Sequence, residues 1–486
     1  MQPSVNETEI QAGLGVLPAG TKALAVMGPC SGTGVTVDTP AGFGSVAALV
    51  AAAGYGDAVE MAARHITLTG NPVLFCKSGA TTAAVTGSMT LTGTGTTTPT
   101  ADSTNAPLGS YQVKIKIIAG GTVGVAGITY QWSVDGGRTY SATLALGTAT
   151  IIALPAETGV VIALTHSTNT LVAGDVISFI TTGAAPNGTE IGTALTALKN
   201  TTSAWDVLGI SQPIDGTLFA TVETAFASMS TAGKPRMYVA NFRIPTEGES
   251  EATYKAAFDT AFSALGTVYG MICAGAAQVA SGISGRLYRR PVSFVVASLE
   301  ASVDEQVDIA DPNLGPIAGV ALADANGNNV YHDESINPGL DDSRACVLRT
   351  WPDGPQGVYV NTPQIMASAG SDFTRAMFRR VMNLARRTAR LYLIFRLNHP
   401  VRVNTSTGFI LEEEALEIEA GGRAVLQAVL GGGPKASGWS MAVHRDDNLL
   451  STKTMHVDTR IIPLAYPETI VETIGFTNPA LKTITG

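Results

Sequence analysis

Residues 54–76 read GYGDAVEMAARHITLTGNPVLFC, a helix-forming stretch followed by a short apolar one. Within it, Asp57–Leu68 is typical of a helix and Pro72–Cys76 (PVLFC) of a buried strand. Working outward, Ala23–Met27 (ALAVM) is another candidate for a buried strand, and Ser45–Ala53 is a candidate helix. Strand and helix in this order predict the start of an α/β domain.

The amino-acid composition changes near Gly79. From there to about Asn187 the chain is rich in Thr, Gly and Ala, poor in charge, and without a helical period. Asp135-Gly136-Gly137 is a hairpin-turn signal between two β-prone runs. We therefore predict an all-β insertion domain over residues 79–188. Its strand candidates are Tyr111–Ile118, Ile128–Val134, Val160–Leu164 and Val176–Thr181.

The α/β character resumes at Thr189, where strand-like and helical segments alternate again. This alternation predicts a mostly parallel sheet that is covered by helices on both faces. The insertion therefore divides one α/β domain into residues 21–78 and 189–350. The expected helices are Leu218–Met229 and Glu251–Leu265, and the expected strands are Arg236–Asn241, Val268–Ala274 and Val292–Ala297.

The last region, residues 351–486, has helices followed by strands, which is an α+β pattern. Ser371–Leu397 is predicted to be one long helix with an N-cap candidate at Ser371, and Glu412–Leu430 a second helix. Residues 1–20 carry few large apolar groups and are expected to form an N-terminal arm. The strand candidates after the second helix are Gly438–His444, Thr454–Pro463 and Glu468–Thr477.

Composition limits the classes of protein that the chain can be. Of its 486 residues 45% are hydrophobic, so a large core is available and wholesale disorder is excluded. Charged residues make up only 14%, against an average of roughly 25%, which suggests that much of the surface faces other protein. The net charge of −9 argues against a general nucleic-acid binder. The N-terminus lacks a secretory signal and no apolar run has the length of a membrane span, so we expect synthesis in a cytoplasm and no membrane insertion.

Motifs for enzyme chemistry are weak. Gly42–Ala47 (GFGSVA) has the spacing of a dinucleotide-binding loop, but it also fits a plain Gly-rich turn before an Ala-rich helix. Gly28–Gly32 (GPCSG) places a cysteine where a nucleophile elbow holds its nucleophile, with no motif that supplies a base or an acid. The 4 cysteines and 6 histidines have no metal-ligand spacing. We therefore predict no catalytic residue, no metal and no cofactor, and a protein that is not an enzyme.

One face of the predicted helix Ser371–Leu397 is rich in arginine. At about 100° per residue, its core candidates lie on the opposite half of the helix. Arginine suits bidentate pairing with carboxylates. A solvated face, a contact with nucleic acid, and pairing with Glu412, Glu413 or Glu417 of the same or another subunit are the alternatives. The arginine stripe consists of Arg375, Arg379, Arg386 and Arg390, flanked by Arg380 and Arg387, and the core candidates are Phe378, Val381, Ala385, Tyr392 and Phe395.

Several segments resemble the core of the contractile-tail sheath proteins of myophages. They are Gly54–Cys76, Gly357–Arg387, Arg402–Glu419 and Asn448–Pro479, and they occur in the order that the family has. The resemblance implies a structural protein rather than an enzyme, with an α/β domain of subtilisin-like topology that lacks a catalytic site. It also implies stacked hexameric rings around a tail tube, and a contraction that drives the tube through the envelope of a target cell.

The resemblance also implies partners and a location. Subunits of this family assemble with copies of themselves, with the tail tube, and with baseplate and tail terminator proteins, in a virion that is assembled in the host cytoplasm and without direct contact to nucleic acid. Terminal arms add strands to the C-terminal sheet of a neighbour, and residues 1–20 and 468–477 would be such arms here. The strand-exchange residues of the second arm are Glu468, Ile470, Glu472, Ile474 and Phe476.

In this arrangement the arginine stripe would face the tail tube or an adjacent subunit, and the insertion would lie on the outside of the assembly. Two other functions stay open at this point. An enzyme that binds a dinucleotide would rest on Gly42–Ala47, and a β-rich surface or adhesion protein would be dominated by residues 79–188.

Overall fold

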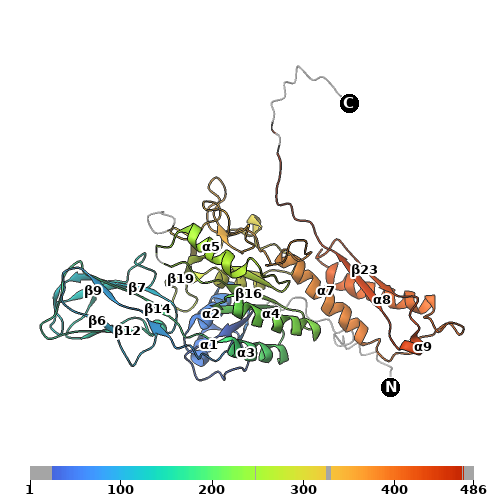
Figure 1. Ribbon diagram of the computed structural model, residues 1–486, viewed down its shortest axis with the longest axis horizontal. Helices are drawn as coiled ribbons and strands as arrows, with labels where there is room; N and C mark the ends of the chain where they lie inside the picture. The colour runs from blue at the N-terminus through green and yellow to red at the C-terminus, as the bar shows by residue number, and fades with distance from the viewer. Residues whose placement is uncertain (1–23, 247, 324–329, 473, 475–486) are drawn as a thin grey trace, which may run out of the picture. The chain divides into compact units, whose positions relative to one another are not determined.

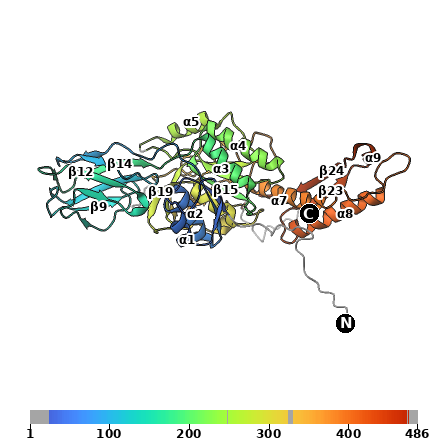
Figure 2. The same ribbon diagram turned by 90° about the horizontal axis from the view of Figure 1, so that it is seen from below.

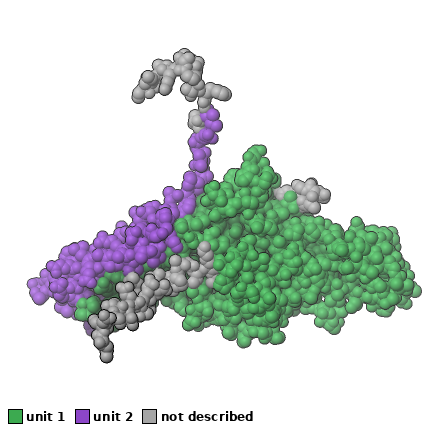
Figure 3. Space-filling view, turned by 180° about the vertical axis from the view of Figure 1, so that it is seen from behind, with its two compact units in different colours: residues 1–400 green, residues 401–486 purple. Residues whose placement is uncertain are grey.

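The computed structural model describes residues 24–246, 248–323, 330–472 and 474 (Figure 1). The chain forms two compact units, Met1–Pro400 and Val401–Gly486, which Figure 3 shows in two colours. The first unit holds a central sheet, helices and a β-rich insertion, and the second is a small unit of helices and a hairpin. The predicted arm over residues 1–20 lies outside the described residues.

A six-stranded sheet forms the middle of the first unit, in the order β17-β16-β15-β1-β3-β2. Neighbouring strands are parallel except at the edge, where β2 is antiparallel to β3. The prediction of a mostly parallel sheet is therefore confirmed. The strands are β1 (Leu24–Gly28), β2 (Ala41–Phe43), β3 (Val73–Lys77), β15 (Val207–Pro213), β16 (Met237–Asn241) and β17 (Gly270–Cys273).

Helices cover both faces of this sheet (Figure 1, Figure 2). Successive residues of a strand point to opposite faces, so Leu24 and Val26 lie in one core while Ala25 and Met27 lie in the other. The first core is closed by α1 (Val46–Ala53), α2 (Asp57–Thr69) and α6 (Ser293–Ser302). The second is closed by α3 (Gly188–Asn200), α4 (Gly216–Thr231) and α5 (Glu251–Phe262).

Side-chain caps mark where two of these helices begin. The side chain of Asn187 accepts a hydrogen bond of 3.0 Å from the backbone N–H of Glu190, and the carboxylate of Glu190 accepts one of 2.8 Å from the N–H of Asn187. This reciprocal capping box starts α3 directly after the insertion. Asp215 caps α4 in the same way through its own carboxylate.

The sequence predicts a strand over Val292–Ala297, and this prediction is wrong because the segment belongs to α6. Phe294, Val295 and Val296 are all buried. A helix that is enclosed on nearly all sides has no polar face, so a short apolar run from it has the pattern of a buried strand.

The regular elements of the insertion are strands, as its composition predicts, apart from a 3-10 helix at Ala156–Thr158 (Figure 1). Its larger sheet has the order β10-β9-β7-β14-β4, with β5 also paired to β14, and its smaller sheets are β11-β12-β6 and β13-β8. It has a hydrophobic core of its own. Its two ends lie side by side, since Thr82 and Ala185 exchange backbone hydrogen bonds of 3.1 and 3.0 Å. The strands are β4 (Val85–Thr86), β5 (Thr90–Thr92), β6 (Pro99–Ala101), β7 (Gln112–Ala119), β8 (Gly121–Thr122), β9 (Thr129–Ser133), β10 (Leu144–Ala145), β11 (Ile151–Ala153), β12 (Val161–Leu164), β13 (Thr170–Leu171) and β14 (Val176–Thr182).

Residues after 340 extend the central sheet beyond β17. The N–H of Cys346 donates to the carbonyl of Ile272, and its carbonyl accepts from the N–H of Ala274. The helix α7 (Ala376–Ile394) follows in the same compact unit, which therefore continues past the boundary near residue 350 that the sequence predicts. The remaining strands of this unit are β18 (Ala276–Ala280), β19 (Leu287–Pro291), β20 (Val320–Ala321), β21 (Leu348–Arg349) and β22 (Tyr359–Val360).

The second unit is a helix on a hairpin. Strands β23 (Gly438–Val443) and β24 (Val457–Ile462) pair antiparallel, α8 (Glu412–Leu430) packs against β23, and a short helix α9 (Leu449–Thr452) lies in the connection. The sequence predicts a further strand over 468–477. Of these residues, 468–472 and 474 are described, and none of them is in a strand. A strand needs a partner strand, and no described strand of the chain pairs with this segment.

Candidate assembly surfaces

Two arginines that flank the predicted stripe hold α7 inside the first unit. Arg387 lies 2.5 Å from the carboxylate of Asp206, which precedes β15. Arg380 lies 3.1 Å from the carboxylate of Glu300 on α6 and donates to two backbone carbonyls just beyond the end of that helix. Carbonyls at a helix C-terminus carry partial negative charge. Arg380 therefore caps α6 and pairs with Glu300 at the same time.

In the N-terminal half of the predicted stripe, Arg375 is partly buried and Arg379 is buried. Arg375 lies 3.1 Å from Asp308. Arg379 is 3% exposed, and its guanidinium lies over the rings of Tyr269 and Phe373 at 4.8 and 5.1 Å from their centroids. Its Nε and Nη2 have no hydrogen-bond partner among the described residues, and burial lowers the pKa of Arg379 to about 10. In this structure both side chains face the interior of the unit.

The C-terminal half of the stripe is exposed and lies at the end of α4. Arg386 donates to the hydroxyl of Ser230 at 2.8 Å and to its backbone carbonyl at 3.4 Å. Arg390 lies so close to Gly233 that a Cβ there would be 2.2 Å from its Nε. The stripe is therefore not one continuous surface. Its exposed part consists of Arg386 and Arg390.

The glutamates of α8, which the sequence offers as partners for the stripe, have partners within the second unit. Glu412 lies 2.8 Å from Arg445, and Glu414 lies 2.5 Å from Arg402. The carboxylates that contact arginines of α7 in the structure are Asp206, Glu300 and Asp308. Sequence reasoning missed them because each is far from α7 along the chain and belongs to no motif.

The segment that follows β24 is exposed. The exposed fractions of Ile470, Val471 and Ile474 are 83%, 87% and 83%. Glu468 and Glu472 lie in the same stretch, and Phe476 lies outside the described residues. The β23–β24 hairpin has no third strand on either outer edge among the described residues. An apolar β-branched segment and open strand edges are features by which chains pair with other chains.

A buried charge joins the insertion to the α/β domain. Arg290, on β19, is 1% exposed and lies 2.5 Å from the carboxylate of Glu60 on α2. It also donates to the backbone carbonyl of Ser110 at 2.6 Å and lies over the ring of Tyr111, both in the insertion. Burial alone would lower the pKa of Arg290, but the carboxylates of Glu60 and Asp57 hold it above its usual range. The insertion thus contacts a buried ion pair of the α/β domain through the carbonyl of Ser110 and the ring of Tyr111, and no sequence motif predicts this contact.

No family model and no curated protein matches the sequence, but several solved structures have a similar fold. The sheath complex of the PVC extracellular contractile injection system, in its contracted state, aligns with a TM-score of 0.52 over 94% of this chain and 92% of that chain, at 10% identity. The contracted helical sheath of the anti-feeding prophage (AFP) aligns with a TM-score of 0.51 over 94% of each chain, at 9% identity. A chain of the contracted AFP baseplate aligns with a TM-score of 0.51 over 94% of this chain and 93% of that chain, at 11% identity.

The chain has the contractile-sheath fold. These alignments span nearly the whole length of each chain, so the likeness is not limited to one sheet. The sheath fold agrees with the mixed α/β architecture that the sequence predicts.

Within the sheath fold, the loop that resembles a dinucleotide fingerprint lacks the required setting. Gly42 lies in β2, a three-residue antiparallel edge strand, whereas the fingerprint needs a parallel strand that leads into the glycine loop. Nearby, burial raises the pKa of the Cys30 thiol by more than Lys77 lowers it. A protonated thiol is a poor nucleophile, so the cysteine elbow is not set up for attack.

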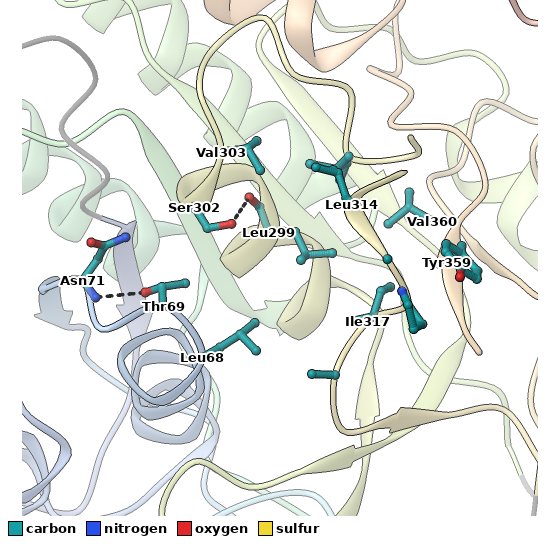
Figure 4. Close-up of a pocket in the computed structure, with 14 residues that line it drawn as sticks. Leu68, Thr69, Asn71, Leu299, Ser302, Val303, Leu314, Ile317, Tyr359 and Val360 are labelled. Atoms are coloured by element: carbon teal, nitrogen blue, oxygen red, sulfur yellow. Dashed lines mark hydrogen bonds between the residues drawn. The ribbon is translucent and has the colours of Figure 1, made fainter. Parts of the chain in front are cut away.

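A cavity of about 440 Å³ lies in the first unit, between the ends of α2 and α6 and the loop before β20 (Figure 4). Its walls are mainly aliphatic, with Leu68, Leu299 and Leu314 among them. Two of the polar side chains drawn there are paired within the chain: Ser302 donates to the carbonyl of Leu299 at 2.7 Å, and Thr69 accepts from the backbone N–H of Asn71 at 3.1 Å. None of the described residues that line the cavity carries a charged side chain.

Two further features are absent from the described part of the chain. No three His, Cys, Asp or Glu side chains gather there as a metal ion would need. No helix there is both long enough and apolar enough to cross a membrane.

Proposed function

We propose that this chain is a structural subunit of a contractile tail sheath and not an enzyme. It assembles with copies of itself into stacked hexameric rings around a tail tube, and the array contracts to drive the tube through a target cell envelope. The observation that carries the proposal is the sheath fold, aligned over 94% of the chain with contracted sheaths. The exposed segment after β24 and the open edges of the β23–β24 hairpin support it.

Strand exchange supplies the assembly step. A two-stranded sheet is marginal by itself, and α8 covers it on one side while both outer edges are open among the described residues. Residues 468–477 of one subunit add to such an edge in the next subunit. The contact is made by backbone hydrogen bonds, so it persists when whole domains rotate as rigid bodies. Because donor and acceptor surfaces differ, the contact is heterologous, and where it does not close into a ring it generates a helical array.

Each region of the chain has its own place in the proposed assembly. The N-terminal arm over 1–20 takes part in the same exchange, the insertion over 79–188 lies outside, and the C-terminal region beyond residue 350 mediates assembly. The partners are further copies, the tail tube, the baseplate and a tail terminator, in a virion assembled in the host cytoplasm. The α/β domain has subtilisin-like topology without a catalytic site.

A single backbone change tests the strand exchange. Val471→Pro removes one backbone N–H from an exposed segment, so it leaves the fold of the isolated subunit unchanged and blocks a ladder hydrogen bond. Val471→Thr is the matched control, because threonine keeps the N–H and favours strands. We expect ringed tubes in negative-stain electron microscopy from the native chain and the threonine variant, and soluble subunits from the proline variant. Native protein that forms no tubes, alone or with tube protein, would contradict the proposed function.

A further inference from the structure

Six basic side chains gather where α3, α4 and the C-terminal half of α7 meet. The contacts between them run through the turn after α4: Lys234 donates to the carbonyl of Lys199 at 2.7 Å, and Arg387 donates to the carbonyl of Pro235 at 3.4 Å. Arg386 reaches the same turn through Ser230. We call this surface the basic edge, and it consists of Lys199, Lys234, Arg236, Arg386, Arg387 and Arg390.

The basic edge carries more positive charge than its surroundings balance. Among the described residues, the carboxylate that forms an ion pair with the basic edge is that of Asp206. It is buried and lies 2.5 Å from Arg387. Burial, and then the neighbouring Arg387, lower the pKa of Arg236 to about 10. In a chain with a net charge of −9, such a cluster of one sign is an unbalanced charge at the surface.

Helix capping accounts for part of this cluster. The C-termini of α3 and α4 carry partial negative charge, and each is favoured by a nearby cation. Lys199 and Arg386 serve these helix ends, since they lie 2.6 and 2.8 Å from hydroxyls of the last turn of α4. Lys234 serves the end of α3, since it donates to the carbonyl of Lys199 in the last turn of that helix, whereas capping does not require the exposed Arg390 as well. The surplus charge fits an anionic partner that the isolated chain lacks.

The chain itself carries a surface of the complementary kind. α8 begins with three consecutive glutamates, and the side chains of Glu412 and Glu413 are 62% and 79% exposed. Their ion pairs with Arg445 and Arg402 are at the surface, and surface pairs contribute little and exchange readily. An array of identical subunits contains one acidic surface for every basic edge.

We propose that the basic edge docks on the acidic start of α8, Glu412, Glu413, Glu414 and Glu417, of a second copy of this chain. The inference rests on the proposed self-assembly and deepens it by naming a contact outside the strand exchange. Charge pairs that stay partly solvated form and separate reversibly, which suits neighbours that must change their relative position.

Charge reversal in two variants tests the contact. The edge variant is Arg386→Glu with Arg390→Glu, and the helix variant is Glu413→Arg with Glu417→Arg. Each variant alone brings like charges together, so we expect the protein concentration needed for tube formation to rise at least about tenfold. An equimolar mixture of the two variants restores tubes, because each edge then meets an opposite charge on another copy. The control, Lys116→Glu with Lys453→Glu, changes the net charge as the edge variant does at two exposed lysines elsewhere, and it assembles like the native chain.

The measurements are the pelleted fraction after ultracentrifugation and negative-stain microscopy, at low and high salt. Restoration in the mixture, and a weaker defect at high salt, would establish the contact between copies. An edge variant that assembles like the native chain would overturn the inference and leave the strand exchange standing. Recovery only when all four changes are in one chain would overturn it as well, because the contact would then lie within a copy. A defect seen only when tube protein or nucleic acid is added would assign the edge to that partner instead.

Discussion

The same substitution at two adjacent arginines of α7 should change the free energy of unfolding by very different amounts. Arg379 and Arg380 are 3% and 4% exposed, so neither is free in solvent. We expect Arg380→Met to lower the free energy of unfolding by about 3–5 kcal/mol. We expect Arg379→Met to change it by less than about 1 kcal/mol.

The loss at Arg380 follows from what its removal leaves behind. Its guanidinium lies 3.1 Å from the carboxylate of Glu300, which is 1% exposed, and it donates to carbonyls of Val303 and Asp304 at 2.8 and 3.2 Å. Methionine fills much of the volume but donates no hydrogen bond. Glu300 is then a buried carboxylate without its charge partner, which is the costly way to break a buried pair.

Arg379 makes no such pair in the described structure. Its contacts with the rings of Tyr269 and Phe373 contribute about 1–2 kcal/mol together. Against this, Nε and Nη2 are buried without acceptors among the described residues, at a cost of about 1–3 kcal/mol for an unsatisfied polar group. The two effects nearly cancel, and methionine keeps a favourable contact with both rings.

Urea unfolding followed by tryptophan fluorescence measures both changes, because Trp205 is buried beside Asp206 in the same unit. A third variant, Arg380→Met with Glu300→Met, checks the mechanism, since replacing both partners by apolar side chains should recover most of the loss. Equal losses for Arg379→Met and Arg380→Met would refute the reasoning. So would a double variant no more stable than Arg380→Met alone.

Other predictions concern the insertion and a buried histidine. Arg290→Met should lower the unfolding free energy by about 3–5 kcal/mol and speed proteolysis at the base of the insertion, because it leaves Glu60 unpaired. Replacing residues 83–184 by a short Gly/Ser linker should preserve folding, which circular dichroism and gel filtration would show, because Thr82 and Ala185 lie side by side and Arg290 keeps its ion pair with Glu60. Glu251 and Glu334 outweigh burial and raise the pKa of His332 from 6.5 to about 9. Because the pKa is raised in the folded chain, protonated His332 contributes fully to the free energy of unfolding below pH 6.5, and this contribution is lost as the pH rises through 9. The free energy of unfolding in urea should therefore fall by about 3 kcal/mol over that window in the native chain. It should stay constant in His332→Gln.

Local patterns in the sequence determine many of the longer helices and strands. The helix Glu412–Leu430 was placed at the bounds that the structure has, and the strands around Ala23–Met27 and Pro72–Cys76 were placed to within a residue. The Thr- and Gly-rich composition located the β insertion. Periodicity and composition are properties of neighbouring residues, so they are visible without knowing what the segment packs against.

Tertiary structure alone decided what the elements face. The arginine pattern of Ser371–Leu397 was visible in the sequence, but Phe395, expected in the core, is 56% exposed, while Arg379 is buried. The partners Asp206 and Glu300 lie more than 70 residues away along the chain (387 − 206 and 380 − 300). Helical spacing gives the direction of a side chain relative to its own helix, whereas burial and pairing depend on which distant segments the fold brings against that face. The same reason explains why Arg290 could not be recognised as the residue that docks the insertion, because its partners come from α2 and the insertion and meet only when the chain is folded.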